Sequence, residues 1–126
     1  MEHSKLLDAA RKAMANSHSP YSKFKVGAAV LMASGKVYTG CNVESASFGL
    51  SLCAERVAIF KAVSEGEKVV SAIALACSQP ERCTPCGACL NLIREFGPNA
   101  EIITETPNGK PRVRRASELL PEVFSL

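Results

Sequence analysis

The segment "LCAERVAIFKAVSEGEKVVSAIALAC" (residues 52–77) combines a helical pattern with a strand-like run that follows it closely. Apolar residues recur at helical spacing up to Glu65, and Gly66 is a residue type at which helices often end. The near-continuous apolar run 69–77 is typical of a strand that is buried on both faces. Helices must then cover both faces of its sheet, so this segment predicts an α/β fold.

The rest of the chain repeats these two patterns. Helical spacing or a start signal indicates further helices at 3–16, 86–96 and 117–120, with Pro85 as a first helical residue and Ser117 as a helix cap. Strand-like runs occur at 25–33, 36–43, 100–105 and 112–115. We therefore expect one domain over residues 1–126, a three-layer α/β/α sandwich with a five-stranded mixed sheet.

Composition excludes several classes of protein. Apolar residues make up 47% and charged residues 21% of 126 residues, which argues against a disordered chain. The longest apolar runs, 26–33 and 72–77, are far shorter than the roughly 20 residues of a membrane-spanning helix. Charges interrupt the apolar positions near the N-terminus, which argues against a signal peptide. We expect a cytoplasmic protein with no membrane partner.

Six cysteines in so short a chain suggest either disulfides or a metal. Without a secretion signal we expect reduced thiols, with Cys41 and Cys77 as buried apolar residues. The sequence "CTPCGAC" (residues 83–89) places three cysteines at intervals of three. Two thiolates one helical turn apart can bind one zinc ion at about 2.3 Å, although a redox dithiol has the same spacing.

Cys53 stands at the start of another predicted helix, and helix N-termini stabilise thiolates. The predicted topology brings both helix starts to one end of the sheet, which gathers Cys53, Cys86 and Cys89 around one ion. Glu55 beside a ligand favours a catalytic zinc with an open fourth position. A closed structural site that also uses Cys83 is the alternative. Arg56 can donate to the sulfurs and offset their charge, or simply face solvent.

The stretches "GCNVESASFGLSLCAERVAIFKAVSEG" (residues 40–66) and "PCGAC" (residues 85–89) closely resemble the small homotetrameric zinc-dependent cytidine deaminases. That superfamily has a His/Cys-x-Glu pattern followed by Pro-Cys-x-x-Cys. The resemblance covers nearly the whole chain. It implies Zn²⁺ on the three cysteines and hydrolytic deamination of cytidine and 2′-deoxycytidine to uridine and 2′-deoxyuridine, in the salvage of pyrimidine nucleosides.

The resemblance also implies roles for individual residues. Glu55 would be the proton shuttle, which takes a proton from the attacking water, gives one to pyrimidine N3 and later protonates the leaving ammonia. Asn42 and Glu44 would bind the ribose. Phe24 would form a wall of the nucleoside pocket, and the main chain at Ala54 would face the pyrimidine edge.

Other implied roles concern neighbouring subunits. Ala46 and Phe48 would approach the site of another copy, and Phe124 would pack over the base from another subunit of a homotetramer. The sequence departs from many relatives at four positions, which affect the substrate range rather than the reaction. Asparagine, tyrosine and an Arg–Gln pair of those relatives are replaced by Ser45, Phe48, Leu90 and Asn91.

Two other functions compete with this interpretation. One is a deaminase of another amino-pyrimidine nucleoside, such as a modified cytidine or an antibiotic. The other is a non-enzymatic zinc module or a nucleic-acid deaminase, which needs extended basic or aromatic tracks. This chain has seven aromatic residues and one short basic run at 110–115, so we expect no nucleic-acid partner. That run is typical of an exposed edge strand, with a phosphate-binding patch as the alternative.

Overall fold

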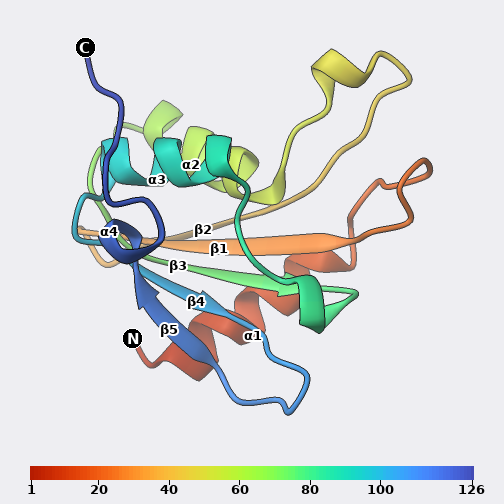
Figure 1. The fold of residues 1–126 in the computed structure, drawn as a ribbon, viewed down its shortest axis with the longest axis horizontal. Helices are drawn as coiled ribbons and strands as arrows, with labels where there is room; N and C mark the ends of the chain where they lie inside the picture. The colour runs from red at the N-terminus through yellow and green to blue at the C-terminus, as the bar shows by residue number, and fades with distance from the viewer.

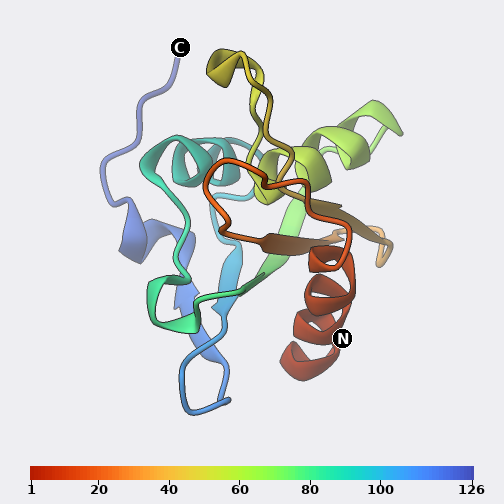
Figure 2. The same cartoon turned by 90° about the vertical axis from the view of Figure 1, so that its right-hand side faces the viewer.

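The computed structural model describes residues 1–126 as a sheet with helices on both faces (Figures 1 and 2). The predicted order of helices and strands is confirmed, and every predicted end lies within two residues of the observed one. The structure also contains two short 3₁₀ helices, η1 and η2, that were not predicted. The elements are α1 (His3–Met14), β1 (Val26–Met32), β2 (Val37–Cys41), η1 (Phe48–Leu50), α2 (Ala54–Ser64), β3 (Val70–Cys77), η2 (Pro80–Arg82), α3 (Gly87–Phe96), β4 (Glu101–Thr104), β5 (Arg112–Arg115) and α4 (Ala116–Leu119).

The sheet has five strands in the order β2-β1-β3-β4-β5. The pair β3–β4 is parallel and the other three pairs are antiparallel, so the predicted mixed sheet is confirmed. A parallel pair needs a crossover, which here contains α3. The basic run Arg112–Arg115 forms β5, the edge strand, with three of its four residues exposed as expected. None of the helices combines the length and the apolar character that crossing a membrane requires.

Helix α1 covers one face of the sheet (Figure 1). Its residues Leu6, Leu7 and Ala10 are buried against alanines of β1 and β3. Close contact is possible because Gly27 has no side chain, since a Cβ there would lie 2.0 Å from the Ala10 carbonyl oxygen. Burial of each leucine stabilises the fold by about 1.5–3 kcal/mol.

Helices α2 and α3 cover the opposite face (Figure 2). The side of α2 that faces the sheet consists mostly of small residues, and Phe60, one of the apolar residues at helical spacing, is 45% exposed. The cause is a short distance between helix and sheet. A Cβ on Gly40 would lie 2.7 Å from the Ala58 nitrogen and 2.9 Å from the Ala54 carbonyl oxygen. Gly40 therefore fixes the first turn of α2 against β2.

Two predicted helix starts are shifted. Helix α3 begins at Gly87 with Cys86 as its N-cap residue, so Pro85 precedes the helix instead of opening it. Helix α4 begins at Ala116, one residue before the predicted cap. Its start is stabilised by the Arg115 N–H group, which donates to Oε1 of Glu118 at 2.8 Å. Local hydrogen bonding, rather than the serine, therefore defines this helix start.

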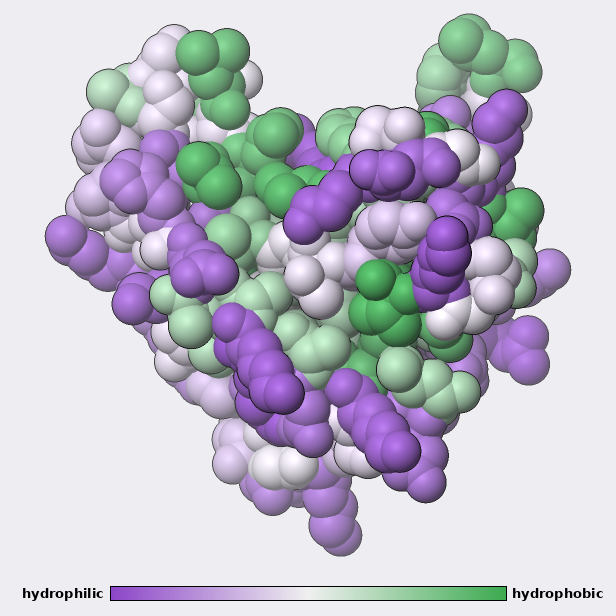
Figure 3. Space-filling view, turned by 180° about the vertical axis from the view of Figure 1, so that it is seen from behind, coloured by the Kyte–Doolittle hydropathy of each residue, from purple (hydrophilic) through white to green (hydrophobic).

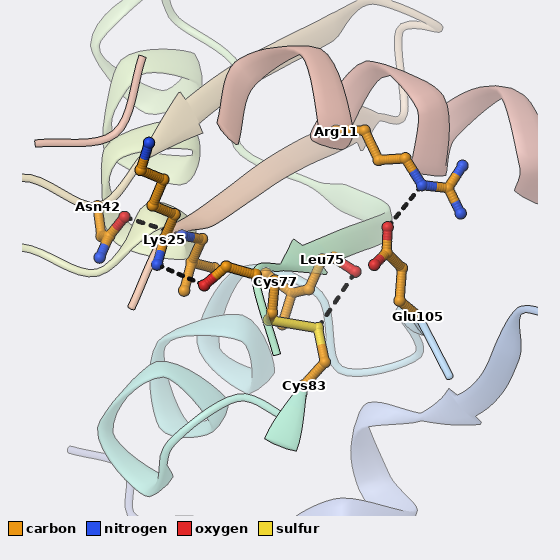
Figure 4. Close-up of a disulfide and its surroundings, with 9 residues drawn as sticks. Arg11, Lys25, Asn42, Leu75, Cys77, Cys83 and Glu105 are labelled. Carbon is orange, nitrogen blue, oxygen red and sulfur yellow. Dashed lines mark hydrogen bonds and ion pairs between the residues drawn. A yellow bond between two sulfur atoms is a disulfide. The ribbon is translucent and has the colours of Figure 1, made fainter. Parts of the chain in front are cut away.

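The expectation that all thiols are reduced is wrong for one pair, because Cys77 and Cys83 form a disulfide (Figure 4). It joins the end of β3 to the segment that precedes α3. Cys77 is buried as predicted, whereas Cys41 is only half-buried. The disulfide removes Cys83 from the candidate metal ligands, in agreement with the predicted three-cysteine site.

Candidate active site

Three free cysteines meet where α2 and α3 begin. Cys53 is the N-cap residue of α2, Cys86 is the N-cap residue of α3, and Cys89 lies in the first turn of α3. Their sulfur atoms lie within 4.8 Å of one another. Two sulfurs bound to one zinc ion at about 2.3 Å are at most about 4.6 Å apart, so small movements suffice to coordinate an ion. The predicted convergence of the two helix starts is confirmed.

The electrostatics of this cluster favour a cation. The pKa of Cys53 is lowered to about 6, first by a hydrogen bond from the Cys89 thiol and then by the charge of Arg56. The pKa of Cys89 is raised for the reciprocal reason, because its proton is shared with the Cys53 sulfur and its side chain is buried. A zinc ion replaces such shared protons, so the donor set fits Zn²⁺.

Arg56 lies beside the sulfurs rather than facing solvent. Its side chain is half-buried, and its pKa is raised mainly by a hydrogen bond to the Cys89 sulfur, with further contributions from Cys53 and Cys86. A guanidinium in this place draws electron density from thiolates. That Arg56 offsets the charge of the sulfurs stays a prediction.

Glu55 faces the same site from the first turn of α2. It is only 5% exposed, and it lines a cavity of about 260 Å³ together with Cys53 and Cys86. The pKa of Glu55 is raised to about 7, chiefly by burial and also by the negative charge of Cys53. A carboxyl group that titrates near neutral pH can both accept and release a proton. The site thus combines a metal centre with a group suited to proton transfer.

Residues predicted to bind the substrate line the same cavity as the cysteines. Four of the residues predicted to bind substrate line it, namely Phe24, Asn42, Glu44 and Ala54. Asn42 is 9% exposed, so its amide is nearly buried. We call the part of the cavity that Cys53 and Cys86 line the metal end, and the part that Asn42 and Glu44 line the polar end.

Three other predicted residues lie outside the cavity. Ala46 is exposed, and Phe48 and Phe124 are 71% and 72% exposed. Because the predicted roles of these residues belong to contacts between copies, a single chain does not test them.

The cavity also contains polar residues for which the sequence predicted no role. Polar Ser22, Ser51 and Thr84 line the cavity beside the predicted residues. Thr84 lies within the cysteine motif 83–89, so its position in the sequence already indicated that it is close to the site. Ser22 belongs to a segment, 17–22, whose serines and proline indicate only a turn, so its sequence carried no sign of a site.

The fold and the site define an α/β/α zinc enzyme in which three cysteines adjoin a buried carboxyl group. Comparison with known proteins gives the family. Residues 1–105 match the family model described as the cytidine and deoxycytidylate deaminase zinc-binding region. The chain belongs to this family of zinc-dependent deaminases.

Individual relatives extend the similarity over the whole chain. It is 44% identical to the "Probable cytidine deaminase" of Dictyostelium discoideum, over 98% of this chain and 84% of that protein. It is 41% identical to a cytidine deaminase of Halalkalibacterium halodurans, over 99% and 96% of the two chains. The crystal structure of cytidine deaminase from Burkholderia pseudomallei matches with a TM-score of 0.92 and 43% identity, and covers 98% of this chain and all of that one.

Proposed function

We propose that the chain catalyses the hydrolytic deamination of cytidine and 2′-deoxycytidine, which yields uridine and 2′-deoxyuridine with release of ammonia. The observation that carries this proposal is that the buried carboxyl group of Glu55 lines one cavity together with Cys53, Cys86 and the Asn42–Glu44 pair. The names of the relatives support the cytosine base as the reacting group. The polar end of the cavity supports a sugar.

Zinc held by Cys53, Cys86 and Cys89 would supply a Lewis acid that makes water nucleophilic near neutral pH. Glu55 takes a proton from the attacking water while the water oxygen bonds to C4 of the pyrimidine, and passes that proton to N3. It then carries the second water-derived proton to the exocyclic nitrogen, the C4–N4 bond breaks, and ammonia leaves. A general acid–base of this kind typically contributes about 10²–10⁴-fold to the rate.

The remaining cavity residues orient the nucleoside. Phe24 provides an apolar wall against which a base or sugar packs. Ala54 lines the cavity where α2 begins, and its main chain would face the edge of the pyrimidine. Asn42 and Glu44 offer a hydrogen-bond donor and acceptors to a sugar hydroxyl. These contacts orient C4 toward the metal and Glu55.

We further infer a homotetramer with sites shared between subunits. Figure 3 shows apolar side chains on two projections, the loop that contains η1 and the C-terminal tail, which flank the face of α2 and α3. Phe48 and Leu50 belong to the first projection, and Phe124 and Leu126 to the second. Contacts with neighbouring copies would bury these residues, and light scattering measures the number of copies. That residues 1–126 form one cytoplasmic domain also stays a prediction.

The first test separates the metal centre from the proton carrier. We expect Glu55→Gln to keep one zinc per chain, because Glu55 is not a ligand, and to lose about 10²–10⁴-fold in kcat. Zinc is measured by atomic absorption and turnover by the absorbance change of the pyrimidine. A variant with near-normal kcat would contradict the role of Glu55.

A substrate panel tests the reaction itself. Wild-type protein is assayed with cytidine, 2′-deoxycytidine, 4-N-modified cytidines, cytosine and cytidine monophosphate. We expect turnover of the first two. Turnover confined to a 4-N-modified cytidine would favour a deaminase of modified nucleosides, and no turnover of any compound would favour a non-enzymatic zinc module or a nucleic-acid substrate.

A further inference from the structure

The loop between α1 and β1 contributes two serine hydroxyls to the polar end of the cavity. Ser17 donates a hydrogen bond to Oδ1 of Asn42, and Ser22 donates one to Oε2 of Glu44. Each bond joins residues more than 20 positions apart in the sequence. The loop therefore holds both members of the amide–carboxylate pair.

The bonds of Asn42 fix the orientation of its amide. Oδ1 accepts from the Val26 N–H group at 2.9 Å as well as from Ser17, and Nδ2 donates to the Phe24 carbonyl at 2.7 Å. A flipped amide would place donors against donors, so only one orientation satisfies these partners. One Nδ2 hydrogen is left without a partner in the chain. Asn42 therefore acts as a donor toward a ligand.

The bonds of Glu44 keep it an acceptor. Oε1 accepts from the N–H groups of Tyr21 and Ser22 at 3.0 and 3.1 Å, and Oε2 accepts from the Ser22 hydroxyl. The pKa of Glu44 is lowered, and its bond with the Ser22 side chain is the largest cause. Glu44 is thus ionised at neutral pH, and each carboxylate oxygen can accept more than one hydrogen bond.

Ser22 connects this carboxylate to the aromatic wall. Its hydroxyl oxygen accepts from the Phe24 N–H group at 3.0 Å, so its single hydrogen is directed to Glu44. Between them lies Lys23, whose φ of +61° is the only positive φ at a non-glycine residue. The left-handed conformation is unfavourable for lysine and persists only where surrounding hydrogen bonds hold it. Here the Lys23 N–H group donates to the Ser19 carbonyl at 3.1 Å, and the Ser22 hydroxyl bonds with Glu44 and Phe24 on either side.

We propose that Ser22 is a positioning residue that aims the Glu44 carboxylate, beside the Asn42 donor, at the 3′-hydroxyl of the substrate. This inference rests on the proposed function. A hydroxyl group can accept a hydrogen bond from the free Nδ2 hydrogen of Asn42 and donate one to the carboxylate of Glu44. A phosphate group at the same position only accepts and is negative, so Glu44 repels it. Among the hydroxyls shared by cytidine and 2′-deoxycytidine, the 3′-hydroxyl is fixed to the sugar ring, whereas the 5′-hydroxyl rotates.

The test compares two substrates that differ only in this hydroxyl, 2′-deoxycytidine and 2′,3′-dideoxycytidine. Steady-state kinetics are measured for the zinc-loaded wild type, Ser22→Ala and the conservative Ser22→Thr. Ser34→Ala is the matched control, because the Ser34 hydroxyl also donates to a glutamate, Glu67, at 2.8 Å, but in an exposed turn outside the cavity. Thermal melting confirms that each variant is folded.

We expect Ser22→Ala to raise KM for 2′-deoxycytidine about tenfold, which is the typical effect of one hydrogen bond to a charged group. We expect its kcat to stay within about twofold of wild type. The KM for the dideoxy substrate should change by less than about twofold, because that substrate lacks the 3′-hydroxyl that would donate to Glu44. Ser22→Thr retains most of the preference for the hydroxyl, and Ser34→Ala equals wild type. If Ser22→Ala changed KM equally for both substrates, or for neither, the proposal would be overturned.

A second measurement keeps this inference separable from the proposed function. If wild type deaminates neither nucleoside, the proposed function fails, and NMR titration of the Glu44 carboxyl carbon still tests the positioning by Ser22. We expect Ser22→Ala to raise the pKa of Glu44 and Ser34→Ala to leave it unchanged. An unchanged pKa in Ser22→Ala would show that the hydroxyl does not hold the carboxylate.

Discussion

The two ends of the cavity are constructed differently. At the metal end, Cys53 and Cys86 are N-cap residues of two helices that pack on the same face of the sheet. At the polar end, which we call the sugar end because we propose that the sugar binds there, the functional groups of Asn42 and Glu44 are held by side-chain and backbone bonds from a loop. Whole helices thus position the ligands at one end, whereas individual hydrogen bonds position the groups at the other.

This difference predicts different responses to mutation. Metal coordination needs all three sulfurs, so loss of one removes the ion and its chemistry together. At the sugar end several bonds converge on each group, and each contributes about 0.5–3 kcal/mol. Substitutions should therefore have all-or-none effects at the metal end and graded effects at the sugar end.

The largest effect is expected at the metal end. We expect Cys86→Ala to lose zinc and to reduce turnover to background, because two remaining thiolates do not hold a catalytic ion. Zinc content and kcat are measured on the same preparation. A variant that keeps zinc and activity would contradict the all-or-none response, since the metal end would then tolerate graded change.

Cys83→Ala is the matched control, three residues from Cys86 in the same motif. We expect it to keep zinc and activity, because Cys83 pairs with Cys77. Without the disulfide the unfolded chain is no longer restricted by a closed loop. For a sequence separation of 6 residues this lowers the free energy of unfolding by about 2 kcal/mol. Loss of zinc from Cys83→Ala would instead support a four-cysteine site.

An intermediate effect is expected at Arg56, which touches the metal end without being a ligand. Removal of its charge in Arg56→Ala should lower activity about 10- to 100-fold, as for other residues that support metal ligands. The charge of Arg56 lowers the pKa of Glu55, so its loss should move the acid limb of the kcat/KM profile to higher pH. Arg56→Lys keeps the charge and should show a smaller shift. An unchanged profile in Arg56→Ala would contradict this role.

The same difference explains which parts of the site the sequence could predict. The metal end follows from short motifs, because helix starts place residues at fixed offsets and Cys53, Glu55 and Cys86 are read directly from them. The roles of Asn42 and Glu44 came only from a family resemblance. Ser22 was missed because its partner lies 22 residues away, and turn composition does not specify such a bond.

Most of the fold was predictable because hydrophobic periodicity decides it. The differences fall where tertiary contact overrides local pattern. Phe60 fits the helical spacing but is exposed, since α2 lies so close to Gly40 that small residues must face the sheet. The pairing of Cys77 with Cys83 likewise depends on how the segment after β3 returns toward the strand, which spacing alone does not indicate.

The smallest effect concerns acid stability at the sugar end. Hydrogen bonds, first that of Ser22, lower the pKa of Glu44 below its ordinary value of 4.5. A carboxylate with a lowered pKa in the folded state stabilises the fold above its ordinary pKa, and this contribution disappears as the pH falls through the lowered value. We therefore expect Glu44→Gln to melt at a lower temperature than wild type at pH 7, and the difference to shrink below pH 4.5. Thermal melting of both proteins from pH 7 to about pH 3 measures it.

Acid also protonates the cysteines and releases zinc, but it does so in both proteins. The difference in melting temperature between wild type and Glu44→Gln therefore isolates the sugar end from the metal end. In a Ser22→Ala background that difference should depend less on pH, because the largest cause of the lowered pKa is gone. A difference that stays constant from pH 7 to about pH 3 would mean that the loop does not favour the ionised carboxylate. The hydrogen bonds at the sugar end would then shape the cavity without tuning its charge.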